Sequence, residues 1–236
     1  VGRGVAATIL DQYEPYRDRE ATEYVNTLGQ ALGLASPQPF LYLGYRFLIL
    51  DSDEINAFAT PGGHIFLTRG MVRLAQTEDD LAAIIAHEIS HVVSQHGMKS
   101  IKSSRITSSV VDALATTADA LTDNQVAELT ASFAGSVDDV AQTLVTSGYS
   151  RATEREADAG AVEILLATGY DPYGLIRVLE RMGEELEPGG LDFAKTHPDP
   201  EVRIRWIEGM LEDEAVLPRS DDAVTRRRFN AALAGI

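Results

Sequence analysis

Residues 77–93 read Thr-Glu-Asp-Asp-Leu-Ala-Ala-Ile-Ile-Ala-His-Glu-Ile-Ser-His-Val-Val, and this stretch has the features of a single amphipathic helix. Thr77 is a suitable N-cap residue, and the acidic residues 78–80 lie where the helix dipole favours negative charge. Apolar side chains recur at the spacing of one helix face, namely Leu81, Ile84, Ile85, Ile89 and Val92. We therefore expect this helix to pack into the core of the fold.

The same helix carries His87 and His91 with Glu88 after the first histidine, which is the HExxH pattern. At about 100° per residue the two imidazoles lie about 40° apart on the helix, so both can bind one metal ion. The motif alone also fits an exposed helix face, which we keep as the alternative. His96 would lie about 180° from His87 if the helix continued, so we exclude it from the site.

A second pair of acidic residues follows in the segment 150–166. Glu154 and Asp158 are four residues apart and share a helix face with three apolar residues, Ala161, Val162 and Leu165. A carboxylate on such a face is costly unless it is paired or binds a metal. A catalytic zinc site needs a third protein ligand, and this chain has no cysteine to supply it. The alternative is an internal salt bridge with Arg151 or Arg155.

The remaining sequence predicts an α+β fold that is mostly helical. A helix is expected over 21–34 and strands over 40–50, 55–60 and 64–68, and nearly everything after residue 74 has a helical pattern. Short turns separate the strands, which favours a small antiparallel meander packed beside the HExxH helix.

The length of 236 residues suits one domain over 1–236, with a core over about 20–210 and a helical tail over 211–236. Residues 97–150 are interpreted as one or two lightly packed helices that could form a mobile lid. The net charge of −16 argues against a nucleic-acid partner, because such binding depends on Lys and Arg contacts to phosphate. No apolar run approaches the ~18 residues of a membrane span, so we expect a soluble chain without a transmembrane segment.

Four blocks of sequence, in order, resemble the M48 family of zinc metallopeptidases. They are residues 56–70, the HExxH motif, Ser-Arg-Ala-Thr-Glu-Arg-Glu-Ala-Asp over 150–158, and Thr-His-Pro-Asp-Pro-Glu-Val-Arg over 196–203. The resemblance extends over about residues 20–210 and is closest to the soluble extracytoplasmic branch. It implies a zincin-like fold of the gluzincin type with one Zn²⁺ per chain.

The resemblance also implies roles for individual residues. It implies three zinc ligands, which are His87, His91 and Glu154. Glu88 would be the general base that acts on the zinc-bound water, and Asp158 would hold a zinc-binding histidine. His197 and Arg203 match a family histidine and arginine near the active site that could stabilise the oxyanion or hold the substrate. If His197 also bound the zinc, the coordination would be closed and the enzyme self-inhibited.

The activity that the resemblance implies is a zinc-dependent endopeptidase acting on unfolded or misfolded proteins, in protein quality control in the periplasm or cell envelope. The strand over 55–60 could bind a peptide along its edge, with Asn56, Ala57 and Phe58 as the contact residues. The alternative is a zinc-stabilised, chaperone-like module that binds unfolded chains and rarely cuts them. The sequence leaves open the oligomeric state, the cleavage preference and the presence of a membrane anchor.

Overall fold

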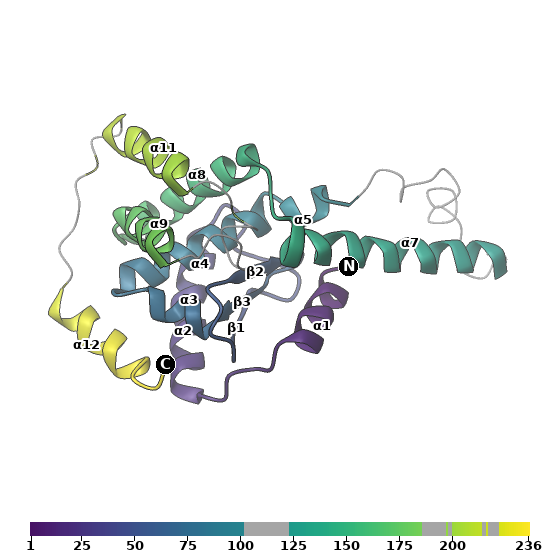
Figure 1. Cartoon of the computed structure of the whole chain (residues 1–236), viewed down its shortest axis with the longest axis horizontal. Coiled ribbons are helices and arrows are strands. Elements are labelled where there is room, and N and C mark those ends of the chain that lie inside the picture. The colour runs from purple at the N-terminus through teal and green to yellow at the C-terminus, as the bar shows by residue number, and fades with distance from the viewer. Residues whose placement is uncertain (102–122, 186–196, 198–199, 214–215, 217–221) are drawn as a thin grey trace.

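The computed structural model describes residues 1–101, 123–185, 197, 200–213, 216 and 222–236. It has the α+β, mostly helical architecture that the sequence predicts (Figure 1). The described elements are α1 (Gly2–Gln12), α2 (Arg19–Ala35), β1 (Arg46–Leu50), β2 (Ala57–Thr60), β3 (His64–Thr68), α3 (Arg69–Leu74), α4 (Glu78–Val93), α5 (His96–Lys99), α7 (Asp123–Gln142), the π-helical turn η3 (Thr143–Ser147), α8 (Arg151–Thr168), α9 (Tyr173–Glu185), α11 (Pro200–Asp213) and α12 (Ala223–Ala232).

The three strands form a mixed sheet in the order β1-β3-β2, not the predicted antiparallel meander. Strands β2 and β3 are an antiparallel hairpin, whereas β1 lies parallel to β3 on its other side, with Arg46 opposite His64. Alternating apolar residues predict which side chains share a face, but they do not predict which strands are neighbours. The first strand is also shorter than expected, because it begins at Arg46 and the aromatic residues before it, Phe40 and Tyr42, are exposed.

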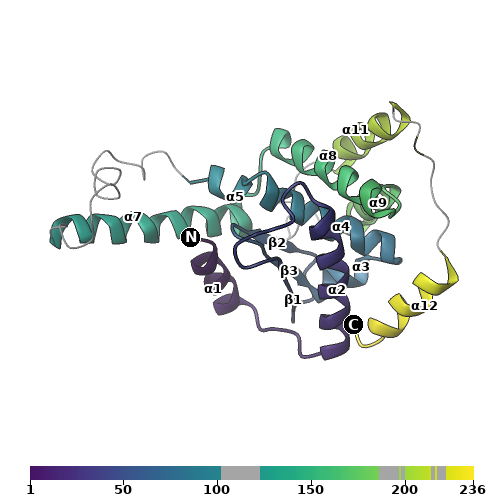
Figure 2. The ribbon, with the colours of Figure 1, turned by 180° about the vertical axis from the view of Figure 1, so that it is seen from behind.

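Successive strand residues point into two different cores, as the period of two requires. In β2, Ala57 and Ala59 face the larger core, while Phe58 faces the smaller one. Helices α2 and α4 cover the larger-core face, and α1 and α7 cover the other (Figures 1 and 2). Helix α4 also packs along α8 and α9 on its far side. The HExxH helix is therefore enclosed by the sheet and by other helices.

The N-terminal end of α4 is fixed by a reciprocal cap. Thr77 accepts a hydrogen bond from the backbone of Asp80, whose side chain accepts bonds from the backbone N–H of Thr77 in return. Asp80 is fully buried and its two carboxylate oxygens pair with Arg177 and Arg181 of α9. The predicted N-cap residue is confirmed, and the buried ion pairs hold α9 against the start of α4.

The C-terminal helix α12 returns to the same end of α4 (Figures 1 and 2). Arg228 of α12 pairs with both carboxylate oxygens of the buried Glu78, which also accepts a hydrogen bond from the hydroxyl of Tyr24. Beyond α12, the carbonyl of Gly235 accepts a bond of 2.6 Å from the Tyr16 hydroxyl. The predicted helical tail therefore packs onto the fold at its described residues.

Helix α7 extends outward from the rest of the structure (Figure 1). It belongs to the segment 97–150 that the sequence suggests as a lid; residues 102–122 of that segment lie outside the described residues. The lid itself stays a prediction. Within the part of the chain that the structure describes, no helix combines the length and the apolar character needed to cross a membrane.

Candidate metal centre

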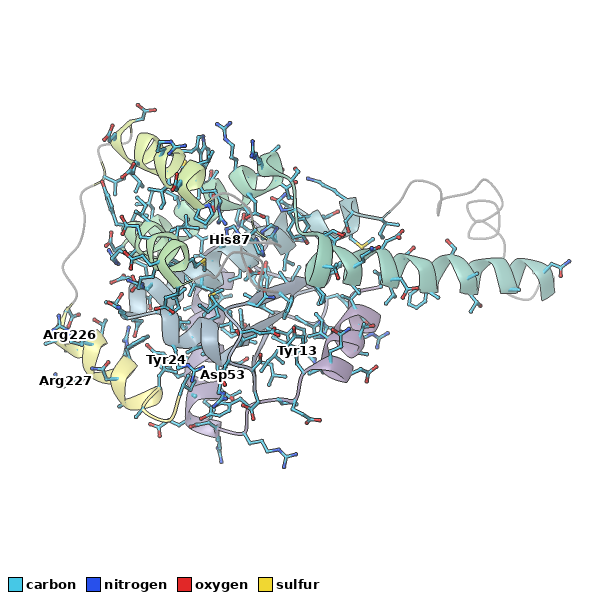
Figure 3. All side chains as sticks on the ribbon, in the orientation of Figure 1. Tyr13, Tyr24, Asp53, His87, Arg226 and Arg227 are labelled. Carbon is cyan, nitrogen blue, oxygen red and sulfur yellow. The ribbon has the colours of Figure 1, made fainter. Side chains whose placement is uncertain are left out.

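Four buried side chains from separate parts of the chain converge on one point. They are His87 and His91 from α4, Glu154 from α8, and His197. One ligand atom from each lies within 4.8 Å of all the others. His87 Nε2 is 3.1 Å from His91 Nε2, and His197 Nδ1 is 3.0 Å from both carboxylate oxygens of Glu154. Figure 3 shows His87 within the body of the molecule.

The close packing of α4 and α8 brings these groups together. A Cβ atom on Gly160 of α8 would lie 2.3 Å from the Ser90 hydroxyl of α4 and 3.2 Å from its Cβ, so a larger residue at this position would force Ser90 to move. Ser150 caps the start of α8 by accepting a hydrogen bond from the backbone N–H of Thr153. Glu154 therefore lies in the first turn of α8, facing the two histidines of the HExxH motif.

The chemistry of this donor set fits zinc. Imidazole nitrogens and a carboxylate are the ligands of zinc sites that lack cysteine. Burial and the neighbouring His87 ring lower the pKa of His91 well below its ordinary value, which favours the neutral ring that binds metals. Burial alone would raise the pKa of the Glu154 carboxyl, but His197 and Arg203 beside it hold that pKa well below its usual range. His91 and Glu154 are thus in the states that a metal ion needs. Burial and Arg203 oppose a charge on His87, but its hydrogen bonds to Asp158 and Glu154 raise the pKa of that ring to about 9, so a metal ion that binds there displaces a proton.

Glu88 lies next to this cluster and is 1% exposed. Within the described residues, its Oε1 atom has no hydrogen-bond partner. Burial raises the pKa of this carboxyl, while the nearby His197 and His87 oppose the rise. A buried carboxylate with an unused oxygen and a raised pKa is suited to accept and return a proton.

The side of His87 that faces away from the cluster is held by an ion pair. Asp158 Oδ1 lies 3.0 Å from His87 Nδ1, and Asp158 receives two hydrogen bonds from Arg203, of 2.9 and 2.6 Å. Arg203 is 3% exposed, and its Nη1 atom lies 3.1 Å from Glu154 Oε2. The buried cation beside Glu154 is thus Arg203 of α11, a residue distant in the sequence. The roles given to Asp158, His197 and Arg203 stay predictions, but all three lie in the site.

His96 contacts His91, and the sequence reasoning that excluded it does not apply. Helix α4 ends at Val93, and Gln95 adopts φ of 55°, a left-handed conformation that is uncommon outside glycine. The chain therefore turns back, and His96 Nδ1 lies 2.9 Å from His91 Nδ1. No local pattern predicts this break, because Gln95 is not a typical turn residue.

Tyr149 is a second residue of the site that the sequence does not single out. Its ring stacks on His91, with 4.4 Å between centroids and an angle of 18° between planes. Its hydroxyl oxygen is buried and has no hydrogen-bond partner among the described residues. Nothing in its local sequence marks it as a residue of the site, because its contact with His91 depends on how segments distant in the sequence pack together.

Among the strands that the structure describes, the predicted substrate strand lies at the edge of the sheet, next to β3. The side chains of Asn56, Ala57 and Phe58 are all buried, and the carbonyl of Asn56 accepts a hydrogen bond from the backbone of Thr68. A peptide bound along this strand would therefore contact its main chain rather than these side chains. The substrate contact stays a prediction.

Comparison with known proteins adds to this geometry. The sequence matches the family model described as "Peptidase family M48" over residues 15–211. It is 30% identical to the "Beta-barrel assembly-enhancing protease" of Escherichia coli (strain K12) over 189 residues, which are 78% of this chain and 37% of that protein. It is 32% identical to the "Mitochondrial metalloendopeptidase OMA1" of Schizosaccharomyces pombe over 182 residues, covering 76% of this chain and 50% of that protein.

A third relative is nearer in length. The "Metalloprotease LoiP" of Escherichia coli is 27% identical over 210 residues, which are 89% of this chain and 76% of that protein. The chain thus spans half or less of the first two relatives and about three quarters of the third. The matched residues 15–211 contain all four side chains of the metal cluster, together with Glu88.

Proposed function

The chain belongs to peptidase family M48, and on that premise we propose that it is a zinc-dependent endopeptidase whose active site is the buried histidine–glutamate cluster. One observation carries the proposal above the others. Ligand atoms of His87, His91, Glu154 and His197 lie within 4.8 Å of one another, next to the carboxyl of Glu88. The first three would be the zinc ligands.

A zinc ion held there would polarise a peptide carbonyl and lower the pKa of a water molecule, so that the water becomes a nucleophile when it loses a proton. Glu88 would take the proton from the attacking water and pass it to the nitrogen of the leaving amine. Its Oε1 atom has no hydrogen-bond partner among the residues that the structure describes, which supports this role, since a carboxylate that already accepts hydrogen bonds is a weaker base. Asp158 would hold the ring of His87 by accepting its outer N–H. We assign Arg203 to positioning, because two carboxylates already engage its guanidinium.

His197 would make the proposed enzyme self-inhibited in this arrangement. Its Nδ1 atom is part of the cluster, and a fourth protein ligand would fill the position that a catalytic zinc keeps open. The same observation favours a second candidate function, a zinc-stabilised module that binds unfolded chains without cutting them. The two functions differ in whether His197 can leave the cluster.

Unfolded or misfolded proteins are the proposed substrates. An edge strand pairs with an extended peptide through main-chain groups, which read little of the sequence, and β2 is such a strand. We place the activity in the periplasm or cell envelope, in protein quality control. One relative from Escherichia coli is named "Beta-barrel assembly-enhancing protease", and this name supports the proposed location.

The test is cleavage of unfolded casein by the zinc-loaded protein, with the variants Glu88→Gln and His197→Ala. We expect cleavage that is lost in Glu88→Gln, because the base is removed while the three ligands remain. We expect His197→Ala to cut faster than the wild type, because the fourth ligand is gone.

A wild-type protein that is silent beside an active His197→Ala variant would support the self-inhibited enzyme. If wild type and both variants bind zinc but none of them cuts, the endopeptidase proposal is wrong and the binding module takes its place.

A further inference from the structure

The outer nitrogen of His91 needs a hydrogen-bond acceptor if this ring binds a metal. His91 Nε2 faces the cluster and lies 3.5 Å from Glu154 Oε1. A neutral imidazole carries one proton, so a ring that binds metal through Nε2 keeps its proton on Nδ1. In the structure, the atom that faces His91 Nδ1 is Nδ1 of His96, at 2.9 Å.

His96 can accept that proton only as one of its two neutral tautomers. If its Nδ1 accepts from His91, its own proton lies on Nε2. That atom is 3.2 Å from Oε2 of Glu156, a residue of α8. Within the described residues, Nε2 of His96 makes no hydrogen bond of good geometry, so the carboxylate of Glu156 would favour a proton on Nε2 through its nearby negative charge rather than through an aligned hydrogen bond.

We propose that His96 is a positioning residue that fixes the tautomer and ring orientation of His91 for metal binding, with Glu156 fixing the tautomer of His96. The proposal rests on the proposed function, because it needs His91 to be a metal ligand. In the usual arrangement a carboxylate or a carbonyl accepts a hydrogen bond directly from a metal-binding histidine. Here the ring of His96 lies between the metal-binding histidine and the carboxylate. The side chain of His96 is 1% exposed, whereas that of Glu156 is 53% exposed.

The backbone and the neighbouring rings support a fixed position for His96. The left-handed conformation of Gln95 turns the chain so that His96 packs back against His91. Tyr149 stacks on His91, and its ring centroid lies 5.9 Å from that of His96. Three acidic residues of helix α8 contact groups of the site. Glu154 lies in the cluster, Glu156 lies beside His96, and Asp158 lies beside His87.

The test measures zinc affinity by competition with a chromophoric chelator, and the d–d absorption spectrum of the cobalt-loaded protein. His96→Phe keeps an aromatic ring in the same place but cannot accept a hydrogen bond. His96→Asn keeps an acceptor oxygen close to the position of Nδ1. Glu156→Ala is matched by Glu163→Ala, which removes an exposed carboxylate from the same helix.

We expect His96→Phe to weaken zinc binding about 10- to 100-fold and to change the cobalt spectrum, as removal of an acceptor behind a ligand does elsewhere. His96→Asn should restore most of the affinity and the wild-type spectrum, which a purely space-filling role would not explain. Glu156→Ala should weaken binding by a smaller factor, and Glu163→Ala should bind as the wild type does.

Wild-type affinity and spectrum in His96→Phe would overturn the proposal, as would equal effects of Glu156→Ala and Glu163→Ala. If His96→Phe does not fold, the proposal is still tested by comparing His96→Asn with the wild type and by comparing the two glutamate variants with each other. A wild-type protein that binds no zinc would instead contradict the proposed function, so the two failures can be told apart.

Discussion

The two histidines of the HExxH motif are supported in opposite ways on the side that faces away from the cluster. Behind His87 lies Asp158, fully buried and paired with the buried cation of Arg203. Behind His91 lies His96, a ring without fixed charge that leads to the half-exposed Glu156. One support is an ion pair in the interior, and the other ends at the surface. Changes to the first should affect folding and metal binding together, whereas changes to the second should affect metal binding alone.

The largest expected effect comes from removing the buried cation behind His87. Arg203→Met would leave the carboxylates of Asp158 and Glu154 in the interior without their positive partner. Breaking a buried ion pair in this way costs about 3–5 kcal/mol of unfolding free energy. Urea unfolding of the metal-free protein measures this loss.

The matched control is Arg205→Met, which removes an exposed arginine from the same helix. We expect that variant to stay within about 0.5 kcal/mol of the wild type. Equal stability of the two variants would mean that the charge pair behind His87 does not support the fold, and the contrast between the two histidines would be lost.

A smaller effect is expected from Asp158→Asn, which keeps the shape of the side chain but removes its charge. The outer N–H of His87 would lose a carboxylate acceptor, and zinc affinity should fall about 10- to 100-fold. Competition with a chelator measures the change. The decrease should exceed that of Glu156→Ala, because a charge in the interior is screened less than one at the surface. Equal decreases would show that burial does not distinguish the two supports.

The smallest expected effect is a dependence on salt. The side chain of Glu156 is 53% exposed, and Oε1 of this residue lies 3.5 Å from the exposed Lys99. Charges in such a position are screened at about 1 M ionic strength. The difference in zinc affinity between wild type and Glu156→Ala should therefore shrink in 1 M salt, whereas that of Asp158→Asn should persist. The reverse pattern would contradict the assignment of the two supports.

Much of the site could be predicted because it depends on spacing within single helices. The four-residue spacing of His87 and His91, and of Glu154 and Asp158, places each pair on one helix face, and the structure has both helices. The N-cap at Thr77 is a local feature for the same reason. Properties that depend on a helix and its own side chains can be read from sequence.

The features that could not be predicted depend on how elements meet. Alternation within β1 does not reveal that this strand pairs with β3 in parallel. The position of His96 depends on the left-handed backbone of Gln95, and a helical wheel assumes that no such break occurs. Arg203 reaches Asp158 only because α11 packs against α8, a contact that no spacing in the sequence encodes.

The family model matches the chain up to residue 211, but residues after 211 also contact the HExxH helix. Arg228 lies beyond that limit and neutralises the buried Glu78 in the first turn of α4. The part of the chain that supports this helix therefore extends past the residues that the family model matches. Loss of Arg228 would leave the buried Glu78 without the cation of α12 and so weaken the start of the helix that carries the HExxH motif.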